Sequence, residues 1–486
     1  MIKFGTSGHR GIIGKTFSIK HVEAIALAVS AYVKKTNNKP KLTIGYDPRT
    51  GNSPNLEKNS FTKAVVDTLL AEGIDVDFFD TYTPTPVVSW YIEQNKLDGG
   101  LILTASHNPP EYNGIKFNPA NGAPAPSEVT KEIEETSNKF YNQNVKPKNI
   151  GIVGKLKYVN ASKPFAKSLI ENCLKYLNIS DSDLSSLIVA VDAKHGTVAA
   201  TWKDIFEELN LENHAIINED PRSDFGGIEP NPTKYETLKD LQIKQKALKA
   251  PITFANDPDG DRHTILDDNG VPLTPEETTV IILDYLLQIN ANILGITTTV
   301  ASSRIIKSAI TKQNLTFKET AVGFKYFAPF LEEARAQNKI ALGVESSGGF
   351  STSFHTLEKC GYLPCVMLLF IIKETGKSVS ELKRNILEKY EAPCFKEAEY
   401  KFSPEKKESL VDFFNKTTKE TYRKNFKEEI SNIIKIDGVK IIFENGNWVL
   451  FRLSGTEPLA RIYAETDSET ASTKLINQAN KMLDAI

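Results

Sequence analysis

Ser106 stands where active-site nucleophiles are often found. It lies within residues 104–109, directly after the apolar run 100–103, which predicts a short buried strand. A serine presented on a loop at a strand end can act as a nucleophile. A serine in such a loop more often only caps a turn, and the stretch alone favours that interpretation. Three further stretches, distant along the chain, reverse the balance.

Asp257, Asp259 and Asp261 predict a site for a hard divalent cation. They alternate with Pro258 and Gly260 in a loop, so their carboxylates can converge on Mg²⁺, which prefers oxygen ligands. An EF-hand is excluded because its sixth and twelfth positions would be Arg262 and Asp268 in place of Gly and Glu. A solvated acidic turn is disfavoured, because three unpaired carboxylates so close together repel one another.

Two more stretches suit recognition of a sugar phosphate. Glu345 and Ser347, within residues 343–349, can bind sugar hydroxyls, although Ser- and Gly-rich loops are common. Lys325 begins a predicted helix, where an anion can bind. In the last part of the chain a phosphate cradle can form, although a hairpin turn with surface arginines fits that stretch equally well. The cradle residues are Arg452, Ser454, Gly455, Thr456 and Arg461.

A nucleophile, a divalent cation, a hydroxyl-binding loop and a phosphate cradle together indicate phosphoryl transfer on a phosphorylated sugar. The composition agrees with a globular enzyme: 486 residues, 40% hydrophobic and 25% charged. The net charge of −2 offers no general attraction for nucleic acid or an anionic membrane, and we expect neither as a partner. Four scattered cysteines and no signal-peptide or membrane-spanning pattern lead us to expect a cytoplasmic protein.

The elements that must position these residues alternate between strand and helix, which predicts three related α/β units with mostly parallel or mixed sheets. In open α/β sheets ligands bind at the carboxyl ends of strands, where Asp47 and Ser106 both fall. We expect strands over 42–46, 74–79, 100–104, 187–192, 215–217, 252–256, 297–301, 315–320 and 340–345, and helices over 21–34, 57–71, 87–95, 198–209, 234–246, 275–287, 304–311 and 324–336.

The last segment has a different pattern, which predicts a smaller α+β domain. A connecting helix is expected over 378–390, and the turn at residues 444–447 predicts a hairpin between strands 438–443 and 448–453. Further strands are expected over 398–402 and 459–465, with helices over 405–414 and 468–483. The resulting domain division is 1–155 with the Ser106 loop, 156–270 with the metal loop, 271–376 with the sugar loop and 377–486 with the phosphate loop.

The four stretches, in this order along almost the whole chain, resemble the α-D-phosphohexomutase superfamily. The resemblance implies four domains around a central cleft, a phosphoserine at Ser106, and Mg²⁺ held by the three aspartates and that phosphoryl group. It implies that Lys116 is the general acid/base, with a plain phosphate-neutralising charge as the alternative. His107 is a second candidate for proton transfer, and a structural hydrogen bond is its other possible role. Arg10 and Arg262 are the expected neighbours of the phosphoryl group.

The resemblance further implies a mutase reaction through a hexose bisphosphate. Glu345 and Ser347 would bind the sugar hydroxyls, and the phosphate cradle would hold the phosphate that does not react. Residues 4–11 and 118–122, and Gly349 in place of a histidine found in other branches, favour the phosphoglucomutase branch with glucose 1,6-bisphosphate as activator. A phosphomannomutase, a mutase of broad hexose range, a phosphatase and a non-catalytic sugar-phosphate-binding protein are the alternatives. We expect a monomer or homodimer.

One position departs from the family pattern. The family often has Lys-Asp-Gly after the sugar loop, whereas this chain has Cys360 between Lys359 and Gly361. If the usual aspartate caps the following helix, its loss would cost about 1 kcal/mol. The departure bears on substrate preference more than on the type of reaction.

Overall fold

The computed structural model describes residues 1–147, 154–181, 183–390, 393–454 and 458–486. The chain divides into two compact units. The first contains Met1–Gly295 and Gly323–Arg384, and the second contains Ile296–Val322 and Asn385–Ile486.

The first sheet has the strand order β1-β5-β4-β2-β3-β6. Strands β2, β3, β4 and β6 are parallel, and β5 pairs antiparallel with both β4 and β1. β4 is buried throughout, as expected for a central strand covered on both faces. The elements are β1 (His9–Ile12), α1 (Ile19–Val33), β2 (Lys41–Tyr46), α2 (Phe61–Ala71), β3 (Asp75–Phe79), α3 (Thr85–Gln94), β4 (Gly99–Leu103), β5 (Tyr112–Pro119), α4 (Ser127–Gln143) and β6 (Leu156–Val159).

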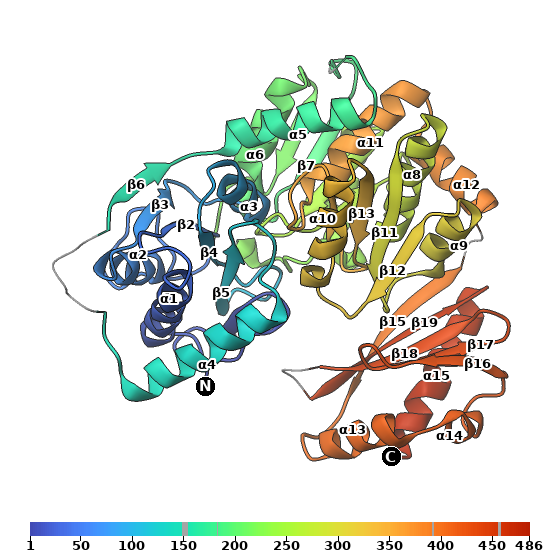
Figure 1. Cartoon of the computed structure of the whole chain (residues 1–486). Helices are drawn as coiled ribbons and strands as arrows, with labels where there is room; N and C mark the ends of the chain where they lie inside the picture. Colours follow the sequence, from blue (N-terminus) through green and yellow to red (C-terminus); the bar gives the residue numbers. More distant parts are fainter. Residues whose placement is uncertain (148–153, 182, 391–392, 455–457) are drawn as a thin grey trace. The chain divides into compact units, whose positions relative to one another are not determined.

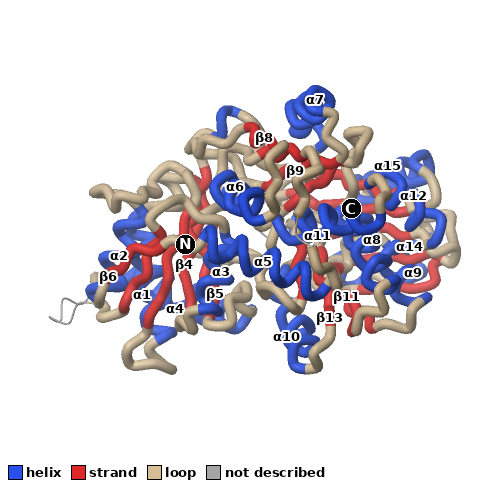
Figure 2. The backbone as a smooth tube through the Cα atoms, turned by 90° about the horizontal axis from the view of Figure 1, so that it is seen from above, coloured by secondary structure: helices blue, strands red, loops and turns tan. Residues whose placement is uncertain are grey.

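The second sheet has the order β10-β9-β7-β8, with β7 parallel to β8 and β9. β10 turns back antiparallel on β9, so the aspartate-rich loop connects the two strands. Helix and strand segments alternate along this part of the chain. Figure 2 shows helices α6 and α7 and strands β8 and β9 of this part. The elements are α5 (Ser162–Tyr176), β7 (Val189–Asp192), α6 (Val198–Glu208), β8 (His214–Ile217), the 3₁₀ turns Phe225–Gly227 and Tyr235–Leu238, α7 (Lys239–Leu248), β9 (Ile252–Asn256) and β10 (His263–Leu266).

The third sheet has the order β12-β11-β13-β14, and β13 pairs antiparallel with β14. The sugar loop, residues 343–349, connects β13 to β14. The elements are α8 (Pro275–Gln288), β11 (Ile293–Thr299), α9 (Arg304–Lys312), β12 (Thr316–Thr320), the 3₁₀ turn Phe324–Tyr326, α10 (Ala328–Ala336), β13 (Ile340–Val344), β14 (Phe350–Thr352), α11 (Tyr362–Thr375) and α12 (Val379–Lys389).

Among the described residues, no helix is both long and apolar enough to cross a membrane.

The second unit is built on an antiparallel sheet of order β15-β19-β18-β17-β16. Helices α13, α14 and α15 all lie on one face of this sheet (Figure 1), and apolar residues of the helices and strands form one buried core there. The elements are β15 (Cys394–Lys401), α13 (Lys406–Lys416), α14 (Lys419–Arg423), β16 (Ile430–Ile434), β17 (Val439–Phe443), β18 (Trp448–Leu453), β19 (Leu459–Thr466) and α15 (Glu469–Asp484).

The predicted fold class is confirmed, and the differences are local. Helix α2 begins at Phe61, four residues later than predicted, because the Ser60 side chain caps it by accepting from the Lys63 amide. Residues 235–238 and 324–326 form 3₁₀ turns ahead of α7 and α10, where continuous helices were predicted. Lys325 therefore lies in a turn and not in the first turn of a helix. Elements β1, β5, β6, β10, β14, β16, α4, α5, α11 and α14 were not predicted.

Candidate active site

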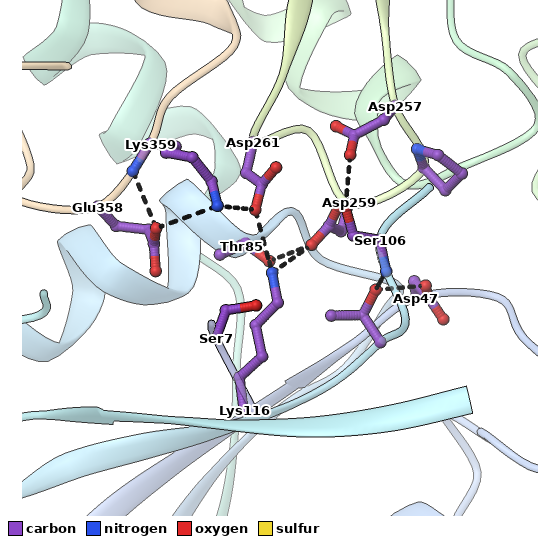
Figure 3. Close-up of polar contacts among 12 residues, drawn as sticks. Ser7, Asp47, Thr85, Ser106, Lys116, Asp257, Asp259, Asp261, Glu358 and Lys359 are labelled. Atoms are coloured by element: carbon purple, nitrogen blue, oxygen red, sulfur yellow. Dashed lines mark hydrogen bonds and ion pairs between the residues drawn. The ribbon is translucent and has the colours of Figure 1, made fainter. Parts of the chain in front are cut away.

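Ser106 is buried at the end of β4 and faces the aspartate-rich loop. Its Oγ donates a hydrogen bond to Oδ2 of Asp257 at 2.8 Å (Figure 3). Nδ1 of His107 lies 3.3 Å from the same hydroxyl. Ser106 has a φ of +52°, which is uncommon for a residue with a side chain and costs of the order of 1 kcal/mol. The surrounding contacts must therefore stabilise this conformation.

The three predicted metal ligands converge. Asp257, Asp259 and Asp261 are buried, and each can offer one carboxylate oxygen, all within 4.8 Å of one another. Within the described residues, Oδ1 of Asp259 and Oδ1 of Asp261 have no hydrogen-bond partner. Buried carboxylate oxygens without partners are costly unless a cation or hydrogen bond compensates them. The site therefore fits a hard divalent cation with oxygen ligands.

The charges of the three carboxylates differ because their neighbours differ. Burial, then repulsion from Asp259 and Asp261, raises the pKa of Asp257 well above its usual value. Burial raises the pKa of Asp261, but Lys116, Lys359 and Arg262 outweigh it and hold the pKa far below its usual value. The same competition leaves the pKa of Asp259 lowered: burial and Asp261 raise it, and Lys116 prevails. Asp257 is thus the carboxyl group that most needs a cation to stay ionised.

Lys116 points from β5 into this cluster (Figure 3). Its Nζ lies 2.7 Å from Oδ2 of Asp259 and 3.0 Å from Oδ2 of Asp261. Burial lowers the pKa of Lys116, but the two aspartates, followed by Glu358, outweigh burial and raise it. A general base needs a lowered pKa. In this arrangement Lys116 is an ammonium ion that partly balances the carboxylates.

Arg10 and Arg262 bring further positive charge to the cluster. Arg262 Nε lies 3.9 Å from both Asp257 Oδ2 and Asp261 Oδ1, and within the described part of the chain it has no hydrogen-bond partner. Arg10 donates to Oδ1 of Asn108 at 2.7 Å. Burial, then repulsion from Arg262, lowers the pKa of Arg10. Two neighbouring guanidinium groups are well suited to a phosphoryl group.

Three polar residues in the same cluster were not singled out as site residues from the sequence. Thr85 Oγ1, at the start of α3, donates to Oδ2 of Asp259 at 2.9 Å. Lys359 Nζ lies 3.0 Å from Oδ2 of Asp261 (Figure 3). Glu358 accepts from Asn118 at 3.0 Å. Thr85 follows strand β3, so the rule that sites form at the carboxyl ends of parallel strands could have identified it.

Cys360 is buried and its backbone amide donates to the carbonyl of Phe350. The N-cap of α11 is Gly361, and no side chain caps the helix. Residue 360 lies one position before the N-cap of α11 and is not the N-cap itself. The structure of this chain therefore gives no support to the prediction that Cys360 removes a helix cap.

Glu345 and Ser347 lie together at the end of β13. Glu345 Oε1 accepts from the backbone amide of Gly323 at 3.0 Å, and Ser347 Oγ lies 3.5 Å from Glu345 Oε2. The carboxylate of Glu345 and the hydroxyl of Ser347 are therefore neighbours in the loop between β13 and β14. Lys325 is half-buried two residues after Gly323, with its ammonium 5.4 Å from the centre of the Tyr326 ring. The carboxylate, the hydroxyl and the ammonium can recognise a polyhydroxylated anion.

The predicted phosphate-binding residues belong to the second unit. Arg452 on β18 and Arg461 on β19 are directly opposite in the antiparallel register. Each is paired with a carboxylate: Arg452 Nε with Asp437 at 2.7 Å and Arg461 Nη1 with Glu397 at 3.1 Å. The Ser454 amide donates to Leu459 O, which closes the base of the loop. Gly455 and Thr456 lie outside the described residues.

Models of protein families match the chain in four segments. They are described as phosphoglucomutase/phosphomannomutase α/β/α domain I at residues 1–144, domain II at 163–270, domain III at 274–390 and the C-terminal domain at 405–481. The chain belongs to the α-D-phosphohexomutase superfamily. It is a phosphohexomutase, an isomerase that acts as an intramolecular phosphotransferase.

Individual relatives align over nearly full length. A "Phosphoglucomutase/phosphomannomutase" of Thermococcus kodakarensis is 28% identical over 99% of this chain and 98% of the relative. A "Probable phosphoglucosamine mutase" of Pyrococcus abyssi is 30% identical, with the same coverages of 99% and 98%. The crystal structure of a phosphoglucomutase/phosphomannomutase family protein from Burkholderia thailandensis has a TM-score of 0.79 at 21% identity, covering 100% of this chain and 98% of that one, and shares the fold. The names of the relatives cover different sugars.

Proposed function

We propose that this phosphohexomutase interconverts α-D-glucose 1-phosphate and glucose 6-phosphate through a phosphoserine at Ser106 and a glucose 1,6-bisphosphate intermediate. The observation that carries the proposal is the convergence of Ser106, Lys116 and the three aspartates in one buried cluster. A protein that only binds sugar phosphates has no need of a buried hydroxyl placed against three carboxylates.

In the first half-reaction, phospho-Ser106 gives its phosphoryl group to the free hydroxyl of the hexose monophosphate. The P–Oγ bond breaks as the bond to the sugar oxygen forms, the hydroxyl proton passes to Nζ of Lys116, and Oγ of Ser106 is left as an alkoxide until it takes the second phosphoryl group. In the second half-reaction, Ser106 Oγ accepts the other phosphoryl group of the bisphosphate. Nζ of Lys116 then returns a proton to the released sugar oxygen, in accordance with microscopic reversibility.

Asp257, Asp259 and Asp261 would hold Mg²⁺ together with the phosphoryl group. When bound, the cation neutralises carboxylate charge and stabilises negative charge on the transferring phosphoryl group. Arg10 and Arg262 add fixed positive charge around the phosphoryl oxygens. Carboxylates neutralised in this way would hold the proton on Lys116 less strongly, which would let Nζ act as the base.

The substrate is held by residues that do not react. Glu345 and Ser347 would accept and donate hydrogen bonds to the sugar hydroxyls in both orientations of the intermediate. Arg452, Ser454, Gly455, Thr456 and Arg461 would bind the phosphate that is not reacting, and Lys325 would bind substrate near Glu345. His107 would orient the Ser106 hydroxyl, since its ring is adjacent.

The preference for glucose rests on Gly349. A Cβ at this position would lie 2.4 Å from Cδ of Lys359, so the lysine side chain occupies the space that a larger residue would need. A histidine after the Ser-Gly of the sugar loop, as in other branches, would displace Lys359. The Thermococcus kodakarensis relative carries both glucose and mannose in its name, which makes a broad hexose range the second candidate.

Two further assignments belong to this proposal. The proposed domain boundaries follow residues 155, 270 and 376. With these boundaries, the Ser106 loop, the metal loop, the sugar loop and the phosphate loop would each belong to a different domain. A reducing, cytoplasmic environment agrees with Cys173, Cys360, Cys365 and Cys394, which are all free thiols.

The test is an assay of purified protein with Mg²⁺ and a trace of glucose 1,6-bisphosphate. Glucose 6-phosphate formed from glucose 1-phosphate is detected with a coupled dehydrogenase, and mannose 1-phosphate and glucosamine 1-phosphate are compared in matching assays. We expect kcat/KM for glucose 1-phosphate at least tenfold above the others, and no turnover in Ser106→Ala. Equal values would replace the proposal with a broad-range mutase. Stoichiometric release of inorganic phosphate would indicate a phosphatase.

A further inference from the structure

Arg49 is a fully buried arginine that donates hydrogen bonds to the backbone of the Ser106 loop. Its Nη2 donates to the carbonyl oxygens of Ser106 and Asn108, both at 2.6 Å. Its Nη1 donates to the carbonyl oxygens of Pro109 and Tyr112, both at 2.8 Å. One guanidinium group therefore binds four carbonyls of the segment that carries the nucleophile, although Arg49 lies 57 residues before Ser106.

Asp47 holds both Arg49 and the start of the same loop. Its Oδ2 accepts from Arg49 Nε at 3.0 Å and from Thr104 Oγ1 at 2.7 Å. Thr104 Oγ1 in turn accepts from the backbone amide of Ser106 at 2.8 Å. Asp47 is itself fully buried. The backbone amide of Ser106 is thus linked to Asp47 through Thr104, and its carbonyl is bound directly by Arg49.

This arrangement meets a requirement specific to the Ser106 loop. The left-handed conformation of Ser106 is unfavourable for a residue with a Cβ, and the contacts on both its amide and its carbonyl stabilise that conformation. The four carbonyl oxygens accept hydrogen bonds from a cation, which offsets part of their negative charge near a phosphoryl group on Ser106. A carbonyl dipole turned toward a phosphoserine would add repulsion beside three carboxylates.

A residue from the part of the chain that forms the second sheet packs against the guanidinium group of Arg49. The ring of Phe225 lies 4.8 Å from the guanidinium carbon of Arg49, at cation–π distance. Phe225 follows strand β8 in a 3₁₀ turn, and its φ of +50° is also left-handed. Arg49 therefore links the loop of Ser106 to the part of the chain that carries the aspartates.

We propose that Asp47 and Arg49 are positioning residues for phosphoryl transfer, which set the orientation of Ser106 without touching substrate; this rests on the proposed role of Ser106 as the phosphorylated residue. The planar guanidinium is essential to this role, because its several N–H donors reach four carbonyls and Asp47 at once. A lysine keeps the charge but has three donors on a single nitrogen.

The experiment measures one half-reaction in Arg49→Lys and Asp47→Asn. Wild type and variants are phosphorylated with glucose 1,6-bisphosphate and isolated. They are then mixed with excess glucose 6-phosphate in a quench-flow instrument, and loss of phosphoserine is followed. Rates are normalised to the folded fraction from circular dichroism. We expect the transfer rate of each variant to fall at least tenfold, with the half-saturating glucose 6-phosphate concentration within twofold of wild type.

Arg335→Lys is the matched control. Arg335 also binds backbone carbonyls, those of Ser353 and His355, and pairs with Glu93; none of these partners belongs to the aspartate cluster or the Ser106 loop. This variant should lose thermal stability and keep its transfer rate.

Folded Arg49→Lys or Asp47→Asn with a transfer rate within twofold of wild type would overturn the inference and leave the proposed function intact. If one variant does not fold, the other decides. Wild-type protein that takes up no phosphoryl group on Ser106 would overturn the proposed function and this inference together.

Discussion

Nζ of Lys116 lies 2.7 Å from Oδ2 of Asp259, so a divalent cation bound by the aspartates would compete with the ammonium group for this carboxylate. We expect Lys116→Met to bind Mg²⁺ at least threefold more tightly than wild type, because the competing charge is gone. Turnover should fall by about 10² to 10⁴, the range for loss of a general acid/base. Titration calorimetry with Mg²⁺ and the coupled mutase assay measure the two effects.

Lys41→Met is the control for that variant, because Lys41 pairs with Asp77 at 2.7 Å in the first sheet. It should leave both Mg²⁺ affinity and turnover unchanged. Weaker Mg²⁺ binding by Lys116→Met would show that the lysine supports the metal site and does not compete with it.

Thr85→Val should weaken metal binding without altering the ligands themselves. The Thr85 hydroxyl donates to Asp259, and removal of a group that orients a metal ligand typically costs about 10- to 100-fold in affinity. We expect the half-activating Mg²⁺ concentration to rise about tenfold. Thr43→Val removes another buried hydroxyl, which donates to the Asp77 carbonyl, and should not change it. An unchanged Mg²⁺ requirement in Thr85→Val would argue against a role for Thr85 in the site.

Ser347→Ala should impair binding of the sugar and leave formation of phosphoserine intact. Loss of one hydrogen bond to substrate costs about 1 kcal/mol, or about fivefold. The KM for glucose 1-phosphate should therefore rise about fivefold, while mass spectrometry of protein treated with glucose 1,6-bisphosphate shows the wild-type level of phosphorylation. Ser186→Ala, at an exposed serine, is the control. A KM equal to that of wild type would remove Ser347 from the proposed sugar site.

Arg452→Gln tests the phosphate-binding role of the second unit. A charge-assisted hydrogen bond to phosphate is worth about 1.5 to 3 kcal/mol, so KM should rise at least tenfold. The salt dependence of KM should also become shallower, because one charge of the site is lost. Arg423→Gln, which breaks the exposed pair with Glu429, should change neither. A wild-type KM in Arg452→Gln would place the phosphate elsewhere.

The stability of the protein should fall in mild acid in part because of His355. Burial, then repulsion from Arg335, lowers the pKa of His355 from 6.5 to about 3, and neither ring nitrogen has a hydrogen-bond partner among the described residues. Between these values the unfolded chain binds a proton that the folded protein does not, so the free energy of unfolding falls as the pH falls.

Between pH 7.5 and pH 5 the free energy of unfolding should therefore decrease by about 2 kcal/mol more in wild type than in His355→Leu. Urea unfolding followed by tryptophan fluorescence measures the difference, and the other histidines affect both proteins equally. Parallel losses in the two proteins would mean that His355 is protonated in the folded state or is not buried.

The fold class and the convergence of the three aspartates could be predicted from the sequence because both depend on local patterns. Alternating apolar runs and helical periodicity predict the sheets, and the aspartate spacing predicts a cation site within one loop. The position of Asp47 and Ser106 after strands also followed from the rule for α/β sheets, since parallel strands bring their carboxyl ends to one edge. Elements without a clear periodicity, such as the uniformly apolar α11, were not predicted, because the prediction relied on local hydrophobic patterns.

The partners of these residues were decided by tertiary structure. Lys116 reaches Asp259 across 143 positions, Thr85 reaches the same carboxylate across 174, and Arg49 binds the Ser106 loop across 57. No local spacing encodes such contacts, because they arise when separate sheets pack and buried charges must find partners. The sequence by itself therefore determined the fold class and the spacing of the three aspartates, because both are local patterns. Only the packed fold decided that Nζ of Lys116 lies between two aspartates and that one arginine binds the backbone of the Ser106 loop, because these contacts join residues far apart in the chain.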